Sequence, residues 1–184
     1  TYHLFDSKEP IIKDKFILFI GSILPYKGLS FFYETVHKYL LTSGYKFVVA
    51  GKGYDSSIDQ MKKDKNFILI NRYLSDTEFA NLTQFASCIV CPYVSGSQSG
   101  ITQTAMVYGT PVVATKIGAF PEFIEEGKNG FLVDYGNKMQ LADAIKRVVD
   151  EKEYDDMFVP QQLNWDGIVS EMETFLKKLS LLNR

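Results

Sequence analysis

The chain has few of the residues and runs that mark several classes of protein. It holds 2 cysteines, 2 histidines and 1 tryptophan in 184 residues. Two cysteines cannot build a disulfide framework, which favours a reducing compartment. No apolar run approaches the roughly 20 residues that a membrane-spanning helix needs, so we expect no transmembrane segment. A net charge of -2 gives no electrostatic case for nucleic acid or an anionic membrane surface as a partner.

The residues that usually carry metal or nucleophilic chemistry are also poorly placed for it. Cys88 and Cys91 have the C-x-x-C spacing of a redox centre or of half a zinc site. Both lie in a β-type apolar run, where positions three apart face opposite sides of a sheet. We interpret them as buried structural thiols and expect no metal. His3 and His37 form no nucleophile–histidine–acid pattern.

What is present is an ordinary globular composition, with 46% apolar and 23% charged residues. The length suits one domain with a full core. The chain does not begin with Met and has no signal pattern, which indicates a fragment. We expect residues 1–14 to be a linker from a missing N-terminal domain. Residues 15–184 would form one domain that closes with a terminal helix at 165–182.

Apolar runs and helical repeats alternate along this domain. Strands are predicted at 16–20, 46–50, 66–70, 87–91, 111–114 and 130–133. Helices are predicted at 29–41, 55–63, 75–85, about 100–109 and 138–150. A capping box, Ser75 with Glu78, starts the third of them, and Met139 is assigned to the apolar face of the last. The alternation predicts an α/β fold with a doubly wound, Rossmann-like parallel sheet.

In such sheets, ligands bind beyond the carboxyl ends of the strands. The loops at these ends carry Lys27, the Gly51 and Gly53 pair, Arg72 with Tyr73, and the Gly/Ser segment 95–100. A lysine beside glycines can reach a phosphate, and a flexible loop that opens a helix presents free backbone N–H groups to an anion. A surface lysine and a plain strand-to-helix turn are the alternatives. The residues alone predict a soluble domain that binds a phosphate-bearing small molecule.

Five segments, in order, then resemble one family. They are the glycine-to-lysine-glycine loop from Gly21 to Gly28, Val48-Val-Ala-Gly-Lys-Gly53, Gly109-Thr-Pro-Val-Val-Ala-Thr115, Gly118-Ala-Phe-Pro-Glu122, and Gly127-Lys-Asn-Gly-Phe-Leu-Val133. Asn164-Trp165 at the start of the terminal helix is also in keeping. Together, over about residues 15–180, they resemble the C-terminal half of retaining GT-B glycosyltransferases of the group 1 (family 4) type.

The resemblance implies that this half binds a UDP- or GDP-linked sugar, with no other cofactor. Lys27 would be the catalytic contact to the donor diphosphate, and the backbone of Ser99, Gly100 and Ile101 would add N–H donors. Arg72, Tyr73 and Leu74 would lie beside the base. The full set of donor-binding residues would be Gly21, Ser22, Lys27, Gly51, Gly53, Arg72, Tyr73, Leu74, Gln98, Ser99, Gly100, Ile101, Gln103 and Thr104.

The implied reaction is front-face transfer of a hexosyl group with retention, in polysaccharide or glycoconjugate synthesis. The acceptor site would lie in the missing N-terminal domain, so the fragment alone would transfer no sugar. We expect a cytoplasmic protein, with peripheral attachment to the inner face of the membrane through the missing half as an alternative.

Two positions depart from the family's pattern. Ser22 stands where the family usually has an arginine, and the family's paired glutamates around the donor loop are absent. Gln98 or Gln103 would then contact the sugar or ribose, and Thr104 would replace the ribose-binding glutamate in one register. Three further hypotheses stay open. They are a GT-B sugar-nucleotide epimerase, a non-catalytic nucleotide-binding or assembly module, which the two departures favour, and, more distantly, a dinucleotide oxidoreductase, for which the third glycine of the fingerprint is missing.

Overall fold

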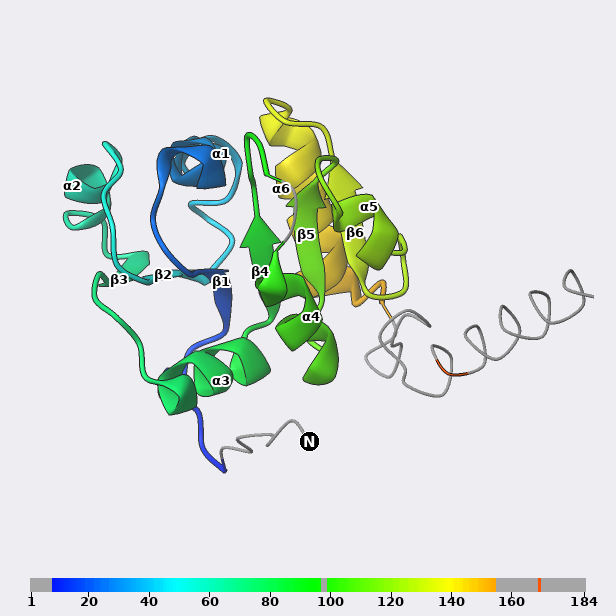
Figure 1. Ribbon diagram of the computed structural model, residues 1–184. Helices are drawn as coiled ribbons and strands as arrows, with labels where there is room; N and C mark the ends of the chain where they lie inside the picture. The colour runs from blue at the N-terminus through cyan, green and yellow to red at the C-terminus, as the bar shows by residue number, and fades with distance from the viewer. Residues whose placement is uncertain (1–7, 97–98, 155–168, 170–184) are drawn as a thin grey trace, which may run out of the picture.

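Six parallel strands form one sheet in the order β3-β2-β1-β4-β5-β6 (Figure 1). The computed structural model describes residues 8–96, 99–154 and 169. The strands are β1 (Phe16–Ile20), β2 (Lys46–Ala50), β3 (Phe67–Ile70), β4 (Cys88–Cys91), β5 (Val112–Thr115) and β6 (Gly130–Val133). The predicted doubly wound α/β fold is confirmed.

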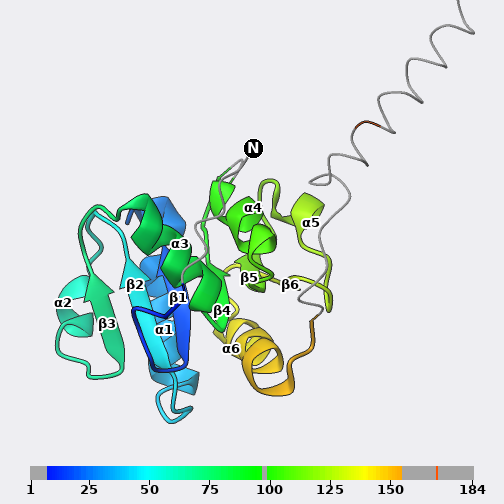
Figure 2. The same ribbon diagram turned by 90° about the horizontal axis from the view of Figure 1, so that it is seen from below.

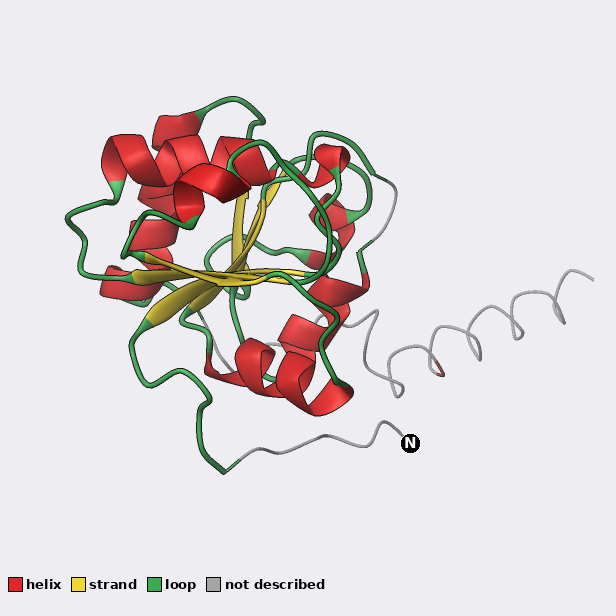
Figure 3. Cartoon of the chain, turned by 90° about the vertical axis from the view of Figure 1, so that its left-hand side faces the viewer, coloured by secondary structure: helices red, strands yellow, loops and turns green. Residues whose placement is uncertain are grey.

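Helices cover both faces of this sheet (Figure 3). They are α1 (Leu29–Tyr39), α2 (Ile58–Met61), α3 (Asp76–Phe85), α4 (Gly100–Val107), α5 (Phe120–Phe123) and α6 (Lys138–Lys146), with a 3-10 turn η1 (Pro25–Lys27) and a π turn η2 (Arg147–Glu151). Figure 2 shows α1 and α6 on one side of the sheet and α3, α4 and α5 on the other. The fold therefore has three layers.

Each strand contributes side chains to two separate cores. In β1, Ile17 and Phe19 pack with α1, α2 and α6, whereas Phe16 and Leu18 pack with α3, α4 and α5. All five residues of β1 are buried, as expected for a parallel strand that is covered on both faces. The continuous apolar runs of the sequence are the direct consequence.

The strand order changes direction between β1 and β4. From β1 the sheet first grows toward one edge through β2 and β3. Strands β4, β5 and β6 then extend it from β1 toward the opposite edge. The loop after β1 leads to α1 on one face, and the loop after β4 leads to α4 on the opposite face. The two loops diverge at the carboxyl ends of adjacent strands, where doubly wound proteins bind their ligands.

Most element boundaries agree with the predictions to within a residue or two, and the capping box of Ser75 and Glu78 is present. Two predictions were wrong. Helix 55–63 shortens to α2, because the Asp55 carboxylate accepts a hydrogen bond from Ser57 N and forms a turn instead. Met139 is 58% exposed and does not join the core. The predicted terminal helix at 165–182 lies outside the described residues except for Val169.

The segment that precedes β1 lies along α3. Ile11 N donates to Asn81 Oδ1 at 2.9 Å, and Asn81 Nδ2 donates to the Glu9 carbonyl at 2.7 Å. Ile12 packs against the core under α3. The part of residues 1–14 that is described is therefore held to the domain by side-chain contacts, and its role as a linker stays a prediction.

The two cysteines lie on opposite faces of the sheet, as their spacing predicted. Cys88 belongs to the α1–α6 core and Cys91 to the α4 core. Both are free and buried, and burial raises the pKa of the Cys91 thiol to about 12. Because the thiolate is the reactive form, we expect neither thiol to react with a disulfide reagent until the domain unfolds. Labelling of the native chain within minutes at neutral pH would contradict this placement.

Candidate functional site

The loops that follow β1 and β4 are fixed to each other by their backbones. Val94 N donates to the Tyr26 carbonyl at 2.7 Å. Gly28, with φ +71°, brings its Cα so close to Pro92 that a Cβ would lie 1.9 Å from the Pro92 carbonyl oxygen. This contact sets the distance between the end of η1 and the segment that leads to α4.

Lys27 ends η1 and is half-buried at this junction. Its Nζ donates to Tyr93 Oη at 2.7 Å and lies 4.6 Å from the centroid of the Tyr93 ring. Burial lowers the pKa of the Lys27 ammonium below that of an ordinary lysine. No carboxylate among the described residues pairs with Lys27, so its charge is available to a bound anion.

Helix α4 begins beside this lysine. Ser99 precedes it without a side-chain cap, and its first turn contains no acidic residue. The first N–H groups of a helix have no intrahelical partner and favour an anion. Gly100 is exposed, and nothing would contact a Cβ built on it, so the helix start is open to a ligand. Gln98, which was predicted to contact the donor, lies outside the described residues.

The remaining predicted residues of α4 have different surroundings. Ile101 is buried, and its side chain packs against the loop after β1. Its Cδ1 would lie 3.1 Å from a Cβ built on Gly21. The Thr104 hydroxyl donates to the Gly100 carbonyl at 3.0 Å and is used within the helix. Gln103 is exposed. Contacts of Gln103 and Thr104 with a sugar or ribose stay predictions.

The glycines of the first two loops allow two backbones to touch. A Cβ on Gly51 would lie 1.9 Å from the Gly21 carbonyl oxygen, and one on Gly53 would lie 2.0 Å from the Ile23 carbonyl oxygen. Ser22 is exposed between them. The loops after β1 and β2 are thus in direct backbone contact and form one continuous surface beside Lys27.

The loop after β3 lies next to this surface. Asn71 exchanges two hydrogen bonds of 3.1 Å with the backbone of Gly53. Tyr73 is 76% exposed, with Lys52 Nζ 4.6 Å from its ring centroid, whereas Leu74 packs against the core. The Arg72 guanidinium pairs with Glu78 at 2.5 and 2.9 Å. Arg72 therefore braces the capping box of α3, and its contact with a base stays a prediction.

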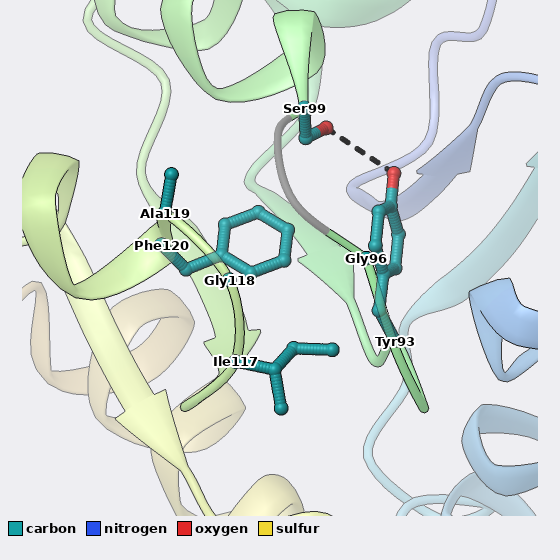
Figure 4. A pocket seen from close by; sticks show the side chains of 7 residues that line it. All are labelled: Tyr93, Gly96, Ser99, Ile117, Gly118, Ala119 and Phe120. Atoms are coloured by element: carbon teal, nitrogen blue, oxygen red, sulfur yellow. Dashed lines mark hydrogen bonds between the residues drawn. The ribbon is translucent and has the colours of Figure 1, made fainter.

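A narrow hollow opens where the loops after β4 and β5 meet (Figure 4). Its volume of about 10 Å³ holds roughly one water molecule. Its lining comprises Tyr93, Gly96, Ser99, Ile117, Gly118, Ala119 and Phe120. In Figure 4 the Tyr93 hydroxyl points toward Ser99, and the two oxygens lie 3.2 Å apart.

Sequence reasoning missed two residues of this site, Tyr93 and Asn71. Tyr93 is the second residue after the strand that ends at Cys91, and Asn71 directly follows the one that ends at Ile70. Their positions at strand ends were the available signal. Among the described residues, no group of three His, Cys, Asp or Glu side chains is arranged to hold a metal, and no helix is long and apolar enough to cross a membrane.

Comparison with known proteins decides the family. The family described as "Glycosyl transferases group 1" matches residues 14–151. The chain belongs to the group 1 glycosyltransferases. Among relatives of this glycosyltransferase domain, the uncharacterized glycosyltransferase MJ1607 of Methanocaldococcus jannaschii is 25% identical over 169 residues. The match covers 86% of this chain and 43% of that protein, so the chain spans less than half the length of this relative.

Two solved structures share the fold of this glycosyltransferase domain. The C-terminal domain of a group 1 glycosyl transferase, LpcC from Francisella tularensis, matches with a TM-score of 0.66 and 25% identity over 86% of both chains. Anabaena HepE in complex with UDP-glucose matches with a TM-score of 0.64 and 18% identity, over 77% of this chain and 40% of that one. The described domain is thus the C-terminal half of the GT-B fold.

Proposed function

We propose that this chain is the donor-binding half of a retaining glycosyltransferase that acts in polysaccharide or glycoconjugate synthesis. The observation that carries the proposal is the half-buried Lys27 beside the uncapped N-terminus of α4. A cation with no carboxylate partner among the described residues and an open helix start together suit a diphosphate. The substrate would be a hexose linked to UDP or GDP.

The chemistry follows from this pairing. When the bond between the sugar and the diphosphate breaks, negative charge develops on the leaving phosphate oxygens. An ammonium group and helix N–H groups fixed at that point stabilise the charge more in the transition state than in the ground state. Lys27 would therefore act as the catalytic residue of this half, and the exposed Tyr73 with Lys52 would lie beside the base.

The comparisons support the class of ligand and the division of the whole protein into two halves. HepE was solved with UDP-glucose, which supports a nucleotide sugar as the ligand class. The chain covers 43% of MJ1607, which supports an acceptor-binding half elsewhere in the whole protein. Two buried, unpaired cysteines are in keeping with a cytoplasmic location.

The chemistry around α4 also favours a second candidate, a nucleotide-binding module without catalysis. The first turn of α4 contains no acidic residue, so the family's paired glutamates are absent there. Ser22 offers no charge where the family usually has an arginine. A site with one cation in place of two still binds a diphosphate but stabilises the departing charge less. Turnover of the whole protein, with both halves present, would separate this candidate from the first.

The isolated chain is expected to bind a nucleotide and transfer no sugar. Calorimetry or ligand-detected NMR with UDP, GDP, ADP and their sugars would identify the base. We expect a dissociation constant in the micromolar to millimolar range, about -4 to -8 kcal/mol. Uridine, guanosine and adenosine, which lack phosphate, serve as matched controls and should bind more weakly. Equal affinity for the nucleoside and the nucleoside diphosphate would contradict the proposal that this site binds the diphosphate. Measurable sugar transfer by the isolated chain would contradict the proposal that the acceptor site lies outside it.

A further inference from the structure

The Tyr93 ring is fixed on several sides at the junction of β1 and β4. It is 3% exposed, and its centroid lies 5.1 Å from that of Phe120 and 6.1 Å from that of Tyr26, both at edge-on angles. The Tyr93 carbonyl accepts a hydrogen bond from Thr115 Oγ1 at 2.7 Å. Ring and backbone are thus anchored to β5, α5 and η1, which leaves the phenol little freedom to move.

The hydroxyl of this fixed ring bonds to two functional groups at once. It accepts a hydrogen bond from Lys27 Nζ at 2.7 Å and lies 3.2 Å from Ser99 Oγ. Lysine only donates, so the phenol proton remains for Ser99 Oγ or for the Cys91 thiol, with which the hydroxyl also forms a side-chain hydrogen bond. Burial raises the pKa of Tyr93 far above its ordinary value, which keeps the hydroxyl protonated and able to serve both partners. The hydroxyl therefore connects the lysine to the residue that precedes α4.

A lysine side chain is flexible, and the rotamer entropy lost when it is ordered opposes binding. A lysine that is already held at the binding position loses less freedom when the anion arrives. Only one of the three ammonium protons is needed for Tyr93. The other two have no partner among the described residues and remain for phosphate oxygens.

We propose that Tyr93 is a positioning residue whose hydroxyl holds the Lys27 ammonium beside the N-terminus of α4, so that both meet the same diphosphate. The inference rests on the proposed function, because it names the device that prepares that site. It assigns Tyr93 no contact with the sugar. A purely structural Tyr93, in which the ring fills space and the hydroxyl is incidental, is the competing account.

The substitution Tyr93→Phe separates the two accounts, because it keeps the ring and removes only the oxygen. For this variant we expect the affinity for UDP, GDP or ADP, whichever the wild-type chain binds, to fall about 10-fold, because the lysine side chain must then be ordered when the diphosphate binds. Affinity for the corresponding nucleoside should not change. Tyr26→Phe is the matched control: its ring also lies near Lys27 Nζ, at 5.9 Å, but no hydrogen bond joins its hydroxyl to the lysine.

A double-mutant cycle shows whether Tyr93 acts through Lys27. In a Lys27→Met background, Tyr93→Phe should have no further effect on diphosphate affinity, because the group that it positions is gone. If Tyr93→Phe weakens binding equally in both backgrounds, or leaves wild-type affinity intact while Lys27→Met abolishes it, the inference fails and the proposed function stands. If the wild-type chain binds no diphosphate, or binds it independently of Lys27, both fail.

A measurement without ligand tests the contact itself. NMR of the side-chain amines in the ligand-free chain should show the Lys27 signal shifted by Tyr93→Phe, with a changed titration midpoint, while the signal of exposed Lys38 stays in place. Thermal unfolding of the same sample verifies that the variant is folded. An unchanged Lys27 signal in a folded Tyr93→Phe variant overturns the inference, whatever the nucleotide affinities are.

Discussion

Replacing Lys27 with methionine is expected to lower the affinity of the chain for a nucleoside diphosphate on the order of 100-fold, about 3 kcal/mol. Methionine keeps the apolar stem and removes the charge. The α4 N–H groups remain and should retain weak binding. The exposed Lys38, at the other end of α1, provides the matched control, and Lys38→Met should leave the affinity unchanged. Titration calorimetry of the three proteins measures both effects.

The same substitution should not destabilise the fold, because burial disfavours the Lys27 charge. The folded-state pKa of this lysine lies below its unfolded value, so the folded chain releases its proton first as the pH rises. Stability relative to the Lys27→Met variant therefore increases with pH through this range, up to about 10.4, the ordinary value for lysine. Matched thermal melts between neutral and alkaline pH would show the difference.

Binding should follow the opposite trend with pH. The ammonium must be charged to hold a diphosphate, so affinity should decline at an alkaline pH where ordinary lysines, titrating near 10.4, are still charged. Lys27→Met should lack this decline. A wild-type affinity that stays constant until ordinary lysines titrate would contradict the burial of the ammonium, and an undiminished affinity of Lys27→Met would remove the basis of the proposed site.

Gly28→Ala is expected to destabilise the fold strongly. The φ of +71° strains a residue with a side chain by about 1–3 kcal/mol, and the new Cβ would meet the Pro92 carbonyl oxygen at 1.9 Å. The backbones of η1 and the β4 loop would have to separate, which adds about 1–3 kcal/mol. We expect a total near 4 kcal/mol and a fall in melting temperature of about 10 °C.

Gly44→Ala is the matched control for this effect. Gly44 has a similar φ of +79°, but nothing lies within 4 Å of a Cβ there. Gly44→Ala should incur only the backbone strain, about 1–3 kcal/mol, without the cost of separating two backbones. If the two alanine variants melt at the same temperature, the close approach between Gly28 and Pro92 is not a constraint on the fold.

Local sequence patterns specify the strands and the capping box but not the contacts between distant loops. The apolar runs fixed the strands because each strand is buried on both faces, and Ser75 with Glu78 marked the start of α3 because a capping box is a local interaction. The contact between Lys27 and Tyr93 joins residues 66 positions apart. It exists because β1 pairs with β4, and an alternating pattern of strands and helices is compatible with many strand orders.

Arg72 shows a second reason. Its position at the end of a strand predicted a ligand contact, and the resemblance pointed to the base. The structure gives its guanidinium a carboxylate, Glu78, six positions away. Sequence placed the residue at the carboxyl end of β3, but the choice between a ligand and a neighbouring carboxylate depends on side-chain conformation, which no periodicity encodes.

The position of β3 at one end of the sheet has a consequence for self-association. Its outer side has no partner strand among the described residues, and Phe67–Ile70 is a run of four apolar residues. An exposed strand of this composition can pair with another copy of the chain. Lys62, Lys63 and Lys65 precede the strand and Arg72 follows it. Of these, Lys62 pairs with Asp59 and Arg72 with Glu78, so Lys63 and Lys65 are the charges expected to repel the same segment of a second molecule and to oppose aggregation through this edge.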